Sequence, residues 1–343
     1  MLTYITRRLL LLPLVLIGVS ILIFVVMSFL SPYELVSTYI KSPEELKNQS
    51  LDALVEKYGL NDPWYLRYFR WMGNVLHGDL GYSEAANMYV LDAIKQRFPA
   101  TLELALFAVV PVVVGGIWLG VISAVHHNRP LDHATRIFAI VGWSLPSFVA
   151  GIVALMFFYG YLGWFPPGRL SAWAHEVIAS GGFRQYTGMN TIDAILNWNW
   201  PIFWDAVRHL VAPTITLAWL WWAFILRITR SSMLDVLNKD YVRTARAKGL
   251  PEKLVINRHA KRNAMIPVAT VAGLMVLGLL GGMAITETVF DYKGIGLLTV
   301  EGAQQLDYTL VLGTTLFYGI LLVLGNLVVD VLYAIIDPRV RLE

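Results

Sequence analysis

The apolar residues of this chain are gathered into long runs that hold almost no charge, rather than into short periodic stripes. A helix that crosses a bilayer needs about 20 mostly apolar residues, because about 30 Å of hydrocarbon is crossed at about 1.5 Å per residue. Six runs reach that length, so the pattern predicts an all-α, polytopic membrane protein with six transmembrane helices. The runs are Leu9–Leu30, Thr101–Val125, Ile137–Leu162, Leu210–Ile228, Pro267–Ile285 and Val311–Ile336.

The first run follows Arg7 and Arg8, which raises the alternative of a cleaved export signal. The run is longer than the apolar part of a signal peptide, and Ser31-Pro32-Tyr33 follows it in place of a small-residue cleavage site. An uncleaved first transmembrane helix is therefore the better interpretation.

Residues 31–100, between the first two runs, predict an extracytoplasmic cap of short helices. Ser42-Pro43-Glu44-Glu45 has the form of a capping box, and Gly59 can end the helix that follows. Asp62-Pro63 begins a second predicted helix. Its apolar side chains at helical spacing are Tyr65, Phe69, Met72 and Leu76.

A second long connection, Gly163 to His209, is rich in tryptophan: Trp173, Trp198, Trp200 and Trp204. Tryptophan gathers at membrane interfaces, which favours an aromatic belt. The alternative is an aromatic surface that meets a docking protein or a substrate.

Composition agrees with a chain solvated by lipid: 57% of the residues are apolar and 15% are charged, against about 45–50% and 25% in soluble proteins. The absence of cysteine excludes disulfides and thiolate metal sites. No G-x-x-x-x-G-K-[ST] sequence is present, so the chain is not expected to be an ATPase or another enzyme. His126, His127 and His133 share a short loop, where a metal site is less expected than a solvated surface.

Lysine and arginine are concentrated in residues 229–265, which predicts that this loop and both chain termini are cytoplasmic. The basic residues of the loop are Arg230, Lys239, Arg243, Arg246, Lys248, Lys253, Arg258, Lys261 and Arg262. The next loop, 286–310, carries only Lys293 against four carboxylates.

Residues 240–249, DYVRTARAKG, predict a short basic helix within that cytoplasmic loop. Asp240 can cap its start, Gly249 can end it in the left-handed conformation, and Pro251 prevents its continuation. A second helix is expected from Pro251 to about Asn263, leading back into the membrane near Pro267. Such a helix can enter a groove on a cytoplasmic partner, or it can lie on anionic lipid.

Residues 240–250 read DYVRTARAKGL and residues 258–267 read RHAKRNAMIP. These stretches resemble the cytoplasmic EAA loop of binding-protein-dependent ABC importer permeases, and most closely the dipeptide/oligopeptide branch. Arg243-Thr244-Ala245 stands where the broad family pattern has Glu-Ala-Ala. Further matching blocks follow in order along nearly the whole chain: residues 4–9, 78–83, 99–104, 144–148, 162–166, 287–290 and 337–339.

The resemblance implies a type I ABC importer transmembrane fold in a prokaryotic inner or plasma membrane. It implies a first transmembrane helix at 1–30, an extracytoplasmic helical cap at 31–100 and a five-helix permease core at 101–343 with a coupling loop at 229–265. The residues it assigns to the ATPase-coupling helix are Asp240, Tyr241, Arg243, Thr244, Ala245, Ala247, Lys248 and Gly249. Those it assigns to the exit from the coupling loop are Arg258, Asn263 and Pro267. Ala245 and Ala247 would keep the helix slim enough to enter a partner's groove.

The implied partners are a second homologous permease, two ABC ATPase subunits and an extracytoplasmic substrate-binding protein; nothing indicates nucleic acid. The chain itself would hold no cofactor, because ATP and magnesium would be bound by the ATPase subunits. Di- and oligopeptides are the first expected substrates. The stretch from Ser171 to Arg208 looks longer than in typical members, which leaves oligosaccharides or another substrate of the peptide branch open. A stand-alone secondary transporter and a scaffold without a pathway are more distant alternatives.

Few polar residues lie within the runs, so we expect a broad and mostly uncharged pathway. Candidates for pathway or packing roles are Ser144, Pro146, Ser147 and Asn326, together with Glu103 and Asp330. Gly116 with Gly120, and Gly278 with Gly282, have the spacing that lets helices approach closely in lipid.

Overall fold

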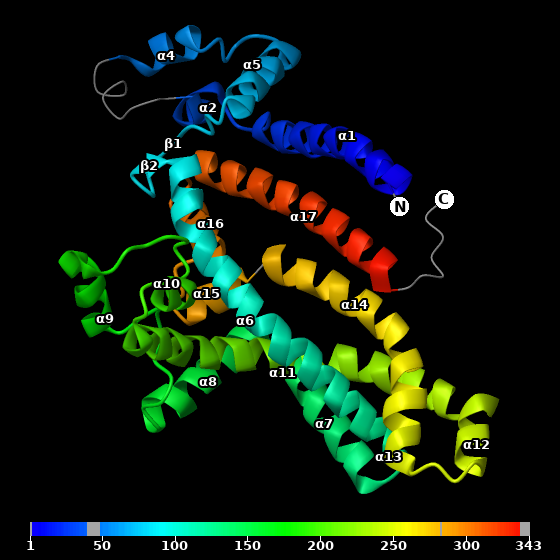
Figure 1. The fold of residues 1–343 in the computed structure, drawn as a ribbon. Helices are drawn as coiled ribbons and strands as arrows, with labels where there is room; N and C mark the ends of the chain where they lie inside the picture. Colours follow the sequence, from blue (N-terminus) through cyan, green and yellow to red (C-terminus); the bar gives the residue numbers. More distant parts are fainter. Residues whose placement is uncertain (1, 40–48, 282, 337–343) are drawn as a thin grey trace. The chain divides into compact units, whose positions relative to one another are not determined.

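The computed structural model describes residues 2–39, 49–281 and 283–336, and they are almost entirely helical (Figure 1). A two-stranded antiparallel ribbon, β1 (Tyr82–Ser83) with β2 (Met88–Tyr89), interrupts the helices, with Tyr82 opposite Tyr89. The predicted all-α class is confirmed. Two compact units can be distinguished, residues 1–101 with 293–327 and residues 102–292 with 328–342.

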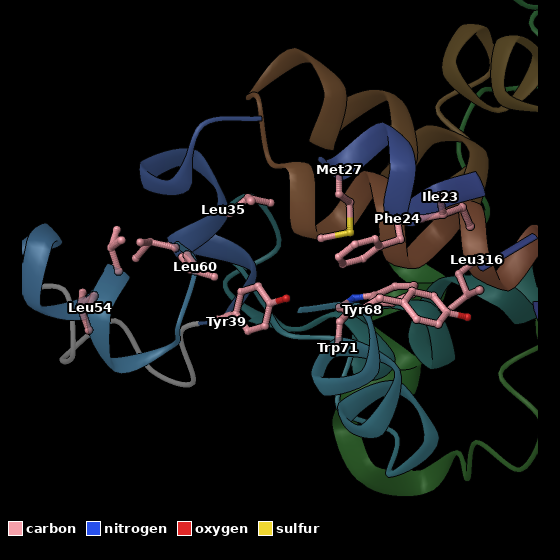
Figure 2. Close-up of a cluster of buried hydrophobic side chains, with 12 residues drawn as sticks. Ile23, Phe24, Met27, Leu35, Tyr39, Leu54, Leu60, Tyr68, Trp71 and Leu316 are labelled. Atoms are coloured by element: carbon pink, nitrogen blue, oxygen red, sulfur yellow. The ribbon is translucent and has the colours of Figure 1, made fainter. Parts of the chain in front are cut away.

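The described part of the first unit contains several helices or parts of helices besides the ribbon. They are α1 (Leu2–Met27), α2 (Pro32–Tyr39), α4 (Leu51–Lys57), α5 (Trp64–Leu76), α16 (Ile295–Gln304) and the first part of α17 (Tyr308–Ile336). The start of α6 (Val90–Val125) also belongs to it. Its core gathers Phe24 and Met27 from α1, Tyr68 and Trp71 from α5, and Leu316 from α17 (Figure 2).

Local signals explain where the short helices of this unit begin and end. Ser31 and Glu34 form a capping box at α2, since the Ser31 N–H donates to Glu34 Oε2 at 2.7 Å and the Glu34 N–H donates to Ser31 Oγ at 3.3 Å. The Ser50 hydroxyl caps α4, and Gly59 follows that helix with φ +61°. The capping box expected at Ser42 lies outside the described residues.

Helix α5 begins after Pro63 as expected, but its packed side is not the stripe singled out from the sequence. Tyr68 and Trp71 are buried against α1, whereas Tyr65, Phe69 and Leu76 of that stripe are exposed. Aromatic residues lie on both sides of this helix, so its periodicity could not select the side that packs. The choice comes from the ring of Phe24 and the hydroxyl of Ser20, which contact Tyr68.

The second unit is built around α11 (Trp200–Leu237), against which α6, α7 and α14 pack. Its other helices are α7 (Pro130–Ser144), α8 (Ser147–Ala154), α9 (Ala172–Val177), α10 (Asn190–Leu196), α12 (Asp240–Ala247), α13 (Glu252–Leu254), α14 (Lys261–Gly281) and α15 (Ala284–Val289). Three π-helical turns extend α8, α9 and α13: η1 (Leu155–Tyr161), η2 (Ile178–Gly182) and η3 (Val255–Ala260).

Glycines on α6 allow the close packing of α6 on α11. A Cβ added at Gly116 would stand 2.6 Å from Ile225 Cβ, and one at Gly120 would stand 2.5 Å from Thr229 Cβ. The predicted close approach at Gly116 and Gly120 is therefore confirmed. The same prediction is not supported at Gly278, where an added Cβ would meet nothing within 4 Å; its partner in the pattern, Gly282, lies outside the described residues.

The described helices long and apolar enough to cross a bilayer are α6, α11 and the part of α17 from Tyr308 to Leu327. The expected span Ile137–Leu162 is not one continuous helix, because α7 and the helix of α8 with η1 meet at a bend of 106°. Leu145 is extended, as the ring of a following proline requires, and α8 restarts after Pro146. This pair is a broken span or a re-entrant segment, and the full count of six stays a prediction.

Candidate functional site

Helix α12 occupies the basic loop where a short helix was predicted. Gly249 has φ +73° and ends it as expected. The expectation that Asp240 caps the helix is wrong: Lys239 is the cap residue, without a side-chain hydrogen bond, and Asp240 is the first helical residue. There the Asp240 carboxylate still suits the positive end of the helix dipole, although its own contact with Arg243, 3.5 Å long, is exposed.

The two sides of α12 differ sharply in polarity. Val242 and Ala245 are buried and form a small apolar cluster with Val255 of η3. The exposed residues of the helix and its end are Asp240, Tyr241, Arg243, Thr244, Arg246, Ala247, Lys248 and Gly249. Ala245, expected to keep the helix slim toward a partner, packs instead against its own chain; Ala247 is the alanine left on the outer side.

Polar contacts fix α12 on the following helical segment. Arg246 donates to Glu252 through Nη2 at 2.7 Å and Nε at 3.2 Å, a two-pronged ion pair across the turn at Gly249. The hydrogen bonds from Arg246 lower the pKa of Glu252 below its ordinary value of 4.5. Near the other end, Asn263 Nδ2 donates to the Tyr241 hydroxyl at 3.0 Å. The basic outer side of α12 is thus presented from a supported position.

The second predicted helix, Pro251 to about Asn263, does not end there. Helical backbone runs from Glu252 through η3 into α14, and Pro267 lies inside α14 rather than at a break. Pro267 had marked the expected boundary because proline usually kinks or ends a helix, but here the helix continues through it. Arg258 and Asn263 are exposed on this continuous segment.

The remaining candidate residues do not join α12. Ser144, Pro146 and Ser147 lie at the bend between α7 and α8, where the Ser144 hydroxyl donates to the Ile140 carbonyl at 2.9 Å. Asn326 is partly buried on α17 in the other unit. The side chain of Asp330 lies outside the described part of the chain. The described residues hold no group of histidines and carboxylates arranged for a metal ion.

Glu103 is the centre of a buried polar cluster. It is 1% exposed, and its carboxylate accepts from Arg169 Nη2 at 2.8 Å, from the Thr191 N–H and hydroxyl at 2.7 and 2.8 Å, and from the Tyr292 hydroxyl at 2.8 Å. Burial raises the pKa of Tyr292 well above its ordinary value, and the charge of Glu103 raises it further. This cluster ties α6 to the connection after η1, to the first turn of α10 and to the connection after α15, so Glu103 serves the structure.

A second buried pair was not foreseen. Asp132 at the start of α7 is fully buried and accepts from Arg230 of α11 through Nε at 2.9 Å and Nη2 at 2.8 Å. Ser123 of α6 and the Asn128 N–H donate to the same carboxylate. The sequence shows the two opposite charges, Asp132 and Arg230, but they are 98 residues apart, and spacing alone cannot predict that they pair.

The tryptophans of the long connection are exposed, which agrees with both interpretations of that segment. Trp198 is 80% exposed and has φ +53°, an uncommon backbone conformation for a bulky residue. Trp200 and Trp204 follow it on the first turns of α11 and are also exposed.

A nearly all-helical chain with apolar helices long enough to cross a bilayer, and with a basic helix supported between two of its long helices, defines a polytopic α-helical membrane protein. The chain belongs to the family of binding-protein-dependent transport system inner membrane components: residues 116–342 match that family, and residues 1–105 match its N-terminal component. This agrees with the resemblance carried by residues 240–250 and 258–267.

Curated relatives match most of the chain. It is 42% identical over 298 residues to the probable D,D-dipeptide transport system permease protein of Escherichia coli, covering 85% of this chain and 86% of the relative. It is 37% identical over 342 residues to the oligopeptide transport system permease protein of Bacillus subtilis, covering 99% and 100%. It is 39% identical over 344 residues to the di/tripeptide transport system permease protein of Pseudomonas aeruginosa, covering 99% of each chain.

Proposed function

We propose that this chain is a permease subunit of an ATP-driven importer, and that it moves di- and oligopeptides from an extracytoplasmic binding protein into the cytoplasm. The names of the relatives from Escherichia coli, Bacillus subtilis and Pseudomonas aeruginosa support peptides as the substrate class. The proposed assembly adds a second permease and two ATPase subunits, which hold the ATP and magnesium. Both termini and the loop 229–265 are cytoplasmic in this proposal, in line with the excess of lysine and arginine there.

The observation that carries the proposal is the outer side of α12. It presents Arg243, Ala247 and Lys248 to solvent, while Val242 and Ala245 hold the helix to its own chain. An ATPase that grips this side would move the helix together with η3 and α14, since the Arg246–Glu252 pair links them. In this proposal the membrane helices have two conformations, and the ATPase subunits change the equilibrium between them through α12.

ATP has to supply the bias. Moving such an equilibrium from 1:99 to 99:1 takes about 5.5 kcal/mol of differential binding. Closure of two ATPase subunits around nucleotide is the source we propose. A stand-alone secondary transporter would instead take up peptide into vesicles in the absence of ATP.

Replacement of Gly249 by valine tests the docking role. The site is open, with nothing within 4 Å of an added Cβ, so the only penalty is φ +73°, which a β-branched residue adopts poorly. We expect Gly249→Val to insert in the membrane but to lose ATP-coupled uptake, and Gly249→Asn, which tolerates this conformation, to keep it. Gly181 is the matched control: its φ is +86° and its surroundings are equally open. Normal uptake with Gly249→Val would contradict the proposal.

Oligosaccharides are the second candidate substrate, because Trp173, Trp198, Trp200 and Trp204 form exposed aromatic surface of the kind that stacks on sugars. Equilibrium binding of peptides and oligosaccharides to the partner binding protein decides between them. Binding of sugars alone would remove the peptide assignment and leave the ATP-coupled mechanism standing.

A further inference from the structure

A groove of about 600 Å³ lies between α7 and α11 in the second unit. Arg136 and Trp143 line it from α7, and Phe224, Arg227, Ser231 and Asp235 line it from α11. Arg227, Ser231 and Asp235 are spaced four residues apart and are all exposed, so they form one stripe along the groove. The pathway was expected to be mostly uncharged, and this groove is not.

The charges of the groove fall into two groups. Arg230 also lines it, but its guanidinium is held by the buried carboxylate of Asp132. Arg136, Arg227 and Asp235 take part in no ion pair among the residues that the structure describes. Arg227 instead lies over the ring of Phe224, 5.6 Å from its centre. The groove therefore offers two free guanidinium groups and one free carboxylate.

The groove lies at the end of the apolar run of α11, because Arg230, Ser231 and Asp235 belong to the loop 229–265 that the proposed topology places in the cytoplasm. Arg227 lies near the end of the apolar run Leu210–Ile228, ten residues or about 15 Å before the end of α11. Ionisable groups in spanning helices face the interior of a bundle or a water-filled cavity, and they mark substrate pathways. A groove that reaches from the end of this run into the cytoplasmic loop is therefore expected to be wet.

The separation of the opposite charges fits a short zwitterion. Arg227 and Asp235 are eight residues apart on α11, which corresponds to about 12 Å along the helix. An extended peptide advances about 3.3–3.6 Å per residue, so the termini of a peptide of about three residues span this distance. A guanidinium binds a carboxylate with two parallel hydrogen bonds, and Trp143 and Phe224 offer apolar contact to side chains of any kind.

We infer that the groove between α7 and α11 is a transit site for short peptides, in which Arg136 and Arg227 receive the C-terminal carboxylate and Asp235 receives the N-terminal ammonium. This inference rests on the proposed function and adds a recognition site in the membrane subunit. Because the contacts are to the two termini and to aromatic surface, the site accepts peptides of varied sequence. A phosphatidylglycerol headgroup, which carries no ammonium, has no counterpart for Asp235.

The test uses a single reporter thiol, which is available because the chain has no cysteine of its own. Ser231→Cys places the thiol between the charges, and Ser180→Cys places one on an exposed serine of η2 as the matched control. The whole transporter is reconstituted in phosphatidylcholine nanodiscs. Labelling of this chain by an anionic and by a cationic thiosulfonate is followed by mass spectrometry, with and without trialanine or its C-terminal amide.

We expect the thiol at 231 to react with the anionic reagent faster than with the cationic one, by up to about tenfold in screened water, because two guanidinium groups against the one carboxylate of Asp235 leave a net positive charge. Arg136→Gln with Arg227→Gln should abolish that preference, and the thiol at 180 should show none. Trialanine should slow labelling at 231, and its amide should slow it less.

Several results would overturn the inference: no charge preference, a thiol at 231 that never reacts because another subunit covers it, or protection by phosphatidylglycerol without protection by trialanine. The last result would assign the groove to an anionic lipid. ATP-driven peptide uptake by the same Ser231→Cys preparation is measured in parallel. Uptake with no protection removes only the transit site, whereas absence of uptake in the unsubstituted transporter counts against the proposed function.

Discussion

Removal of the Glu103 charge should destabilise the second unit more than any surface change. In Glu103→Gln the guanidinium of Arg169 keeps its buried position and loses its only carboxylate partner among the described residues. The Thr191 N–H and hydroxyl and the Tyr292 hydroxyl then share a neutral amide oxygen. Breaking one side of a buried ion pair costs about 3–5 kcal/mol, because a charge is left uncompensated.

The measurement is thermal unfolding of the purified chain in detergent. At roughly 2–4 °C per kcal/mol for a unit of this size, Glu103→Gln should lower the apparent Tm by about 6–20 °C. Glu176→Gln is the matched control, since Glu176 is an exposed carboxylate of the same unit. In a double-mutant cycle with Arg169→Met, the combined loss should be clearly smaller than the sum of the single losses, because no charge remains unpaired.

A loss below about 1 kcal/mol for Glu103→Gln would refute this reasoning, because that is the range of an exposed ion pair. Strict additivity with Arg169→Met would do the same. Either result would return Glu103 to the list of candidates for the pathway.

The remaining predictions concern helix packing and the base of α12. Gly116→Ala should cost about 1–3 kcal/mol in the same unfolding assay, since its Cβ would stand 2.6 Å from Ile225 Cβ. Gly278→Ala, whose Cβ would meet nothing within 4 Å, should be neutral or slightly stabilising. Equal effects of the two substitutions would contradict the close packing of α6 on α11. Glu252→Gln should weaken ATP-coupled uptake without loss of insertion, because it releases Arg246 and frees α12 from the segment that it moves; unchanged coupling would show that this pair is dispensable. Since Arg246 lowers the pKa of Glu252, the pair's contribution to holding α12 in place is fully present above the ordinary value of 4.5 and is lost as the pH falls through the lowered value. Cleavage of α12 by protease should therefore increase only below pH 4.5.

Much of the fold could be predicted because lipid imposes a simple rule on sequence. Spanning helices must be long and apolar, so α6, α11 and α17 lie where the runs Thr101–Val125, Leu210–Ile228 and Val311–Ile336 predicted them. The stop at Gly249 was equally legible, because a left-handed residue after a helix is a local requirement. The sharp bend within the run Ile137–Leu162 could not be predicted, since a proline inside an apolar stretch permits either a kink or a full break.

The sequence by itself determined that this protein lies in a lipid bilayer and where along the chain its basic loop falls. Both follow from the hydropathy and charge of continuous segments, which need no tertiary contact. Tertiary structure alone decided which side of α5 packs, that Ala245 faces inward, and that Asp132 meets Arg230 while Arg136 and Arg227 stay free in a groove. Those outcomes depend on which atoms from distant segments arrive at the same place: Asp132 and Tyr68 find their partners, Arg230 and Ser20, far away in the sequence.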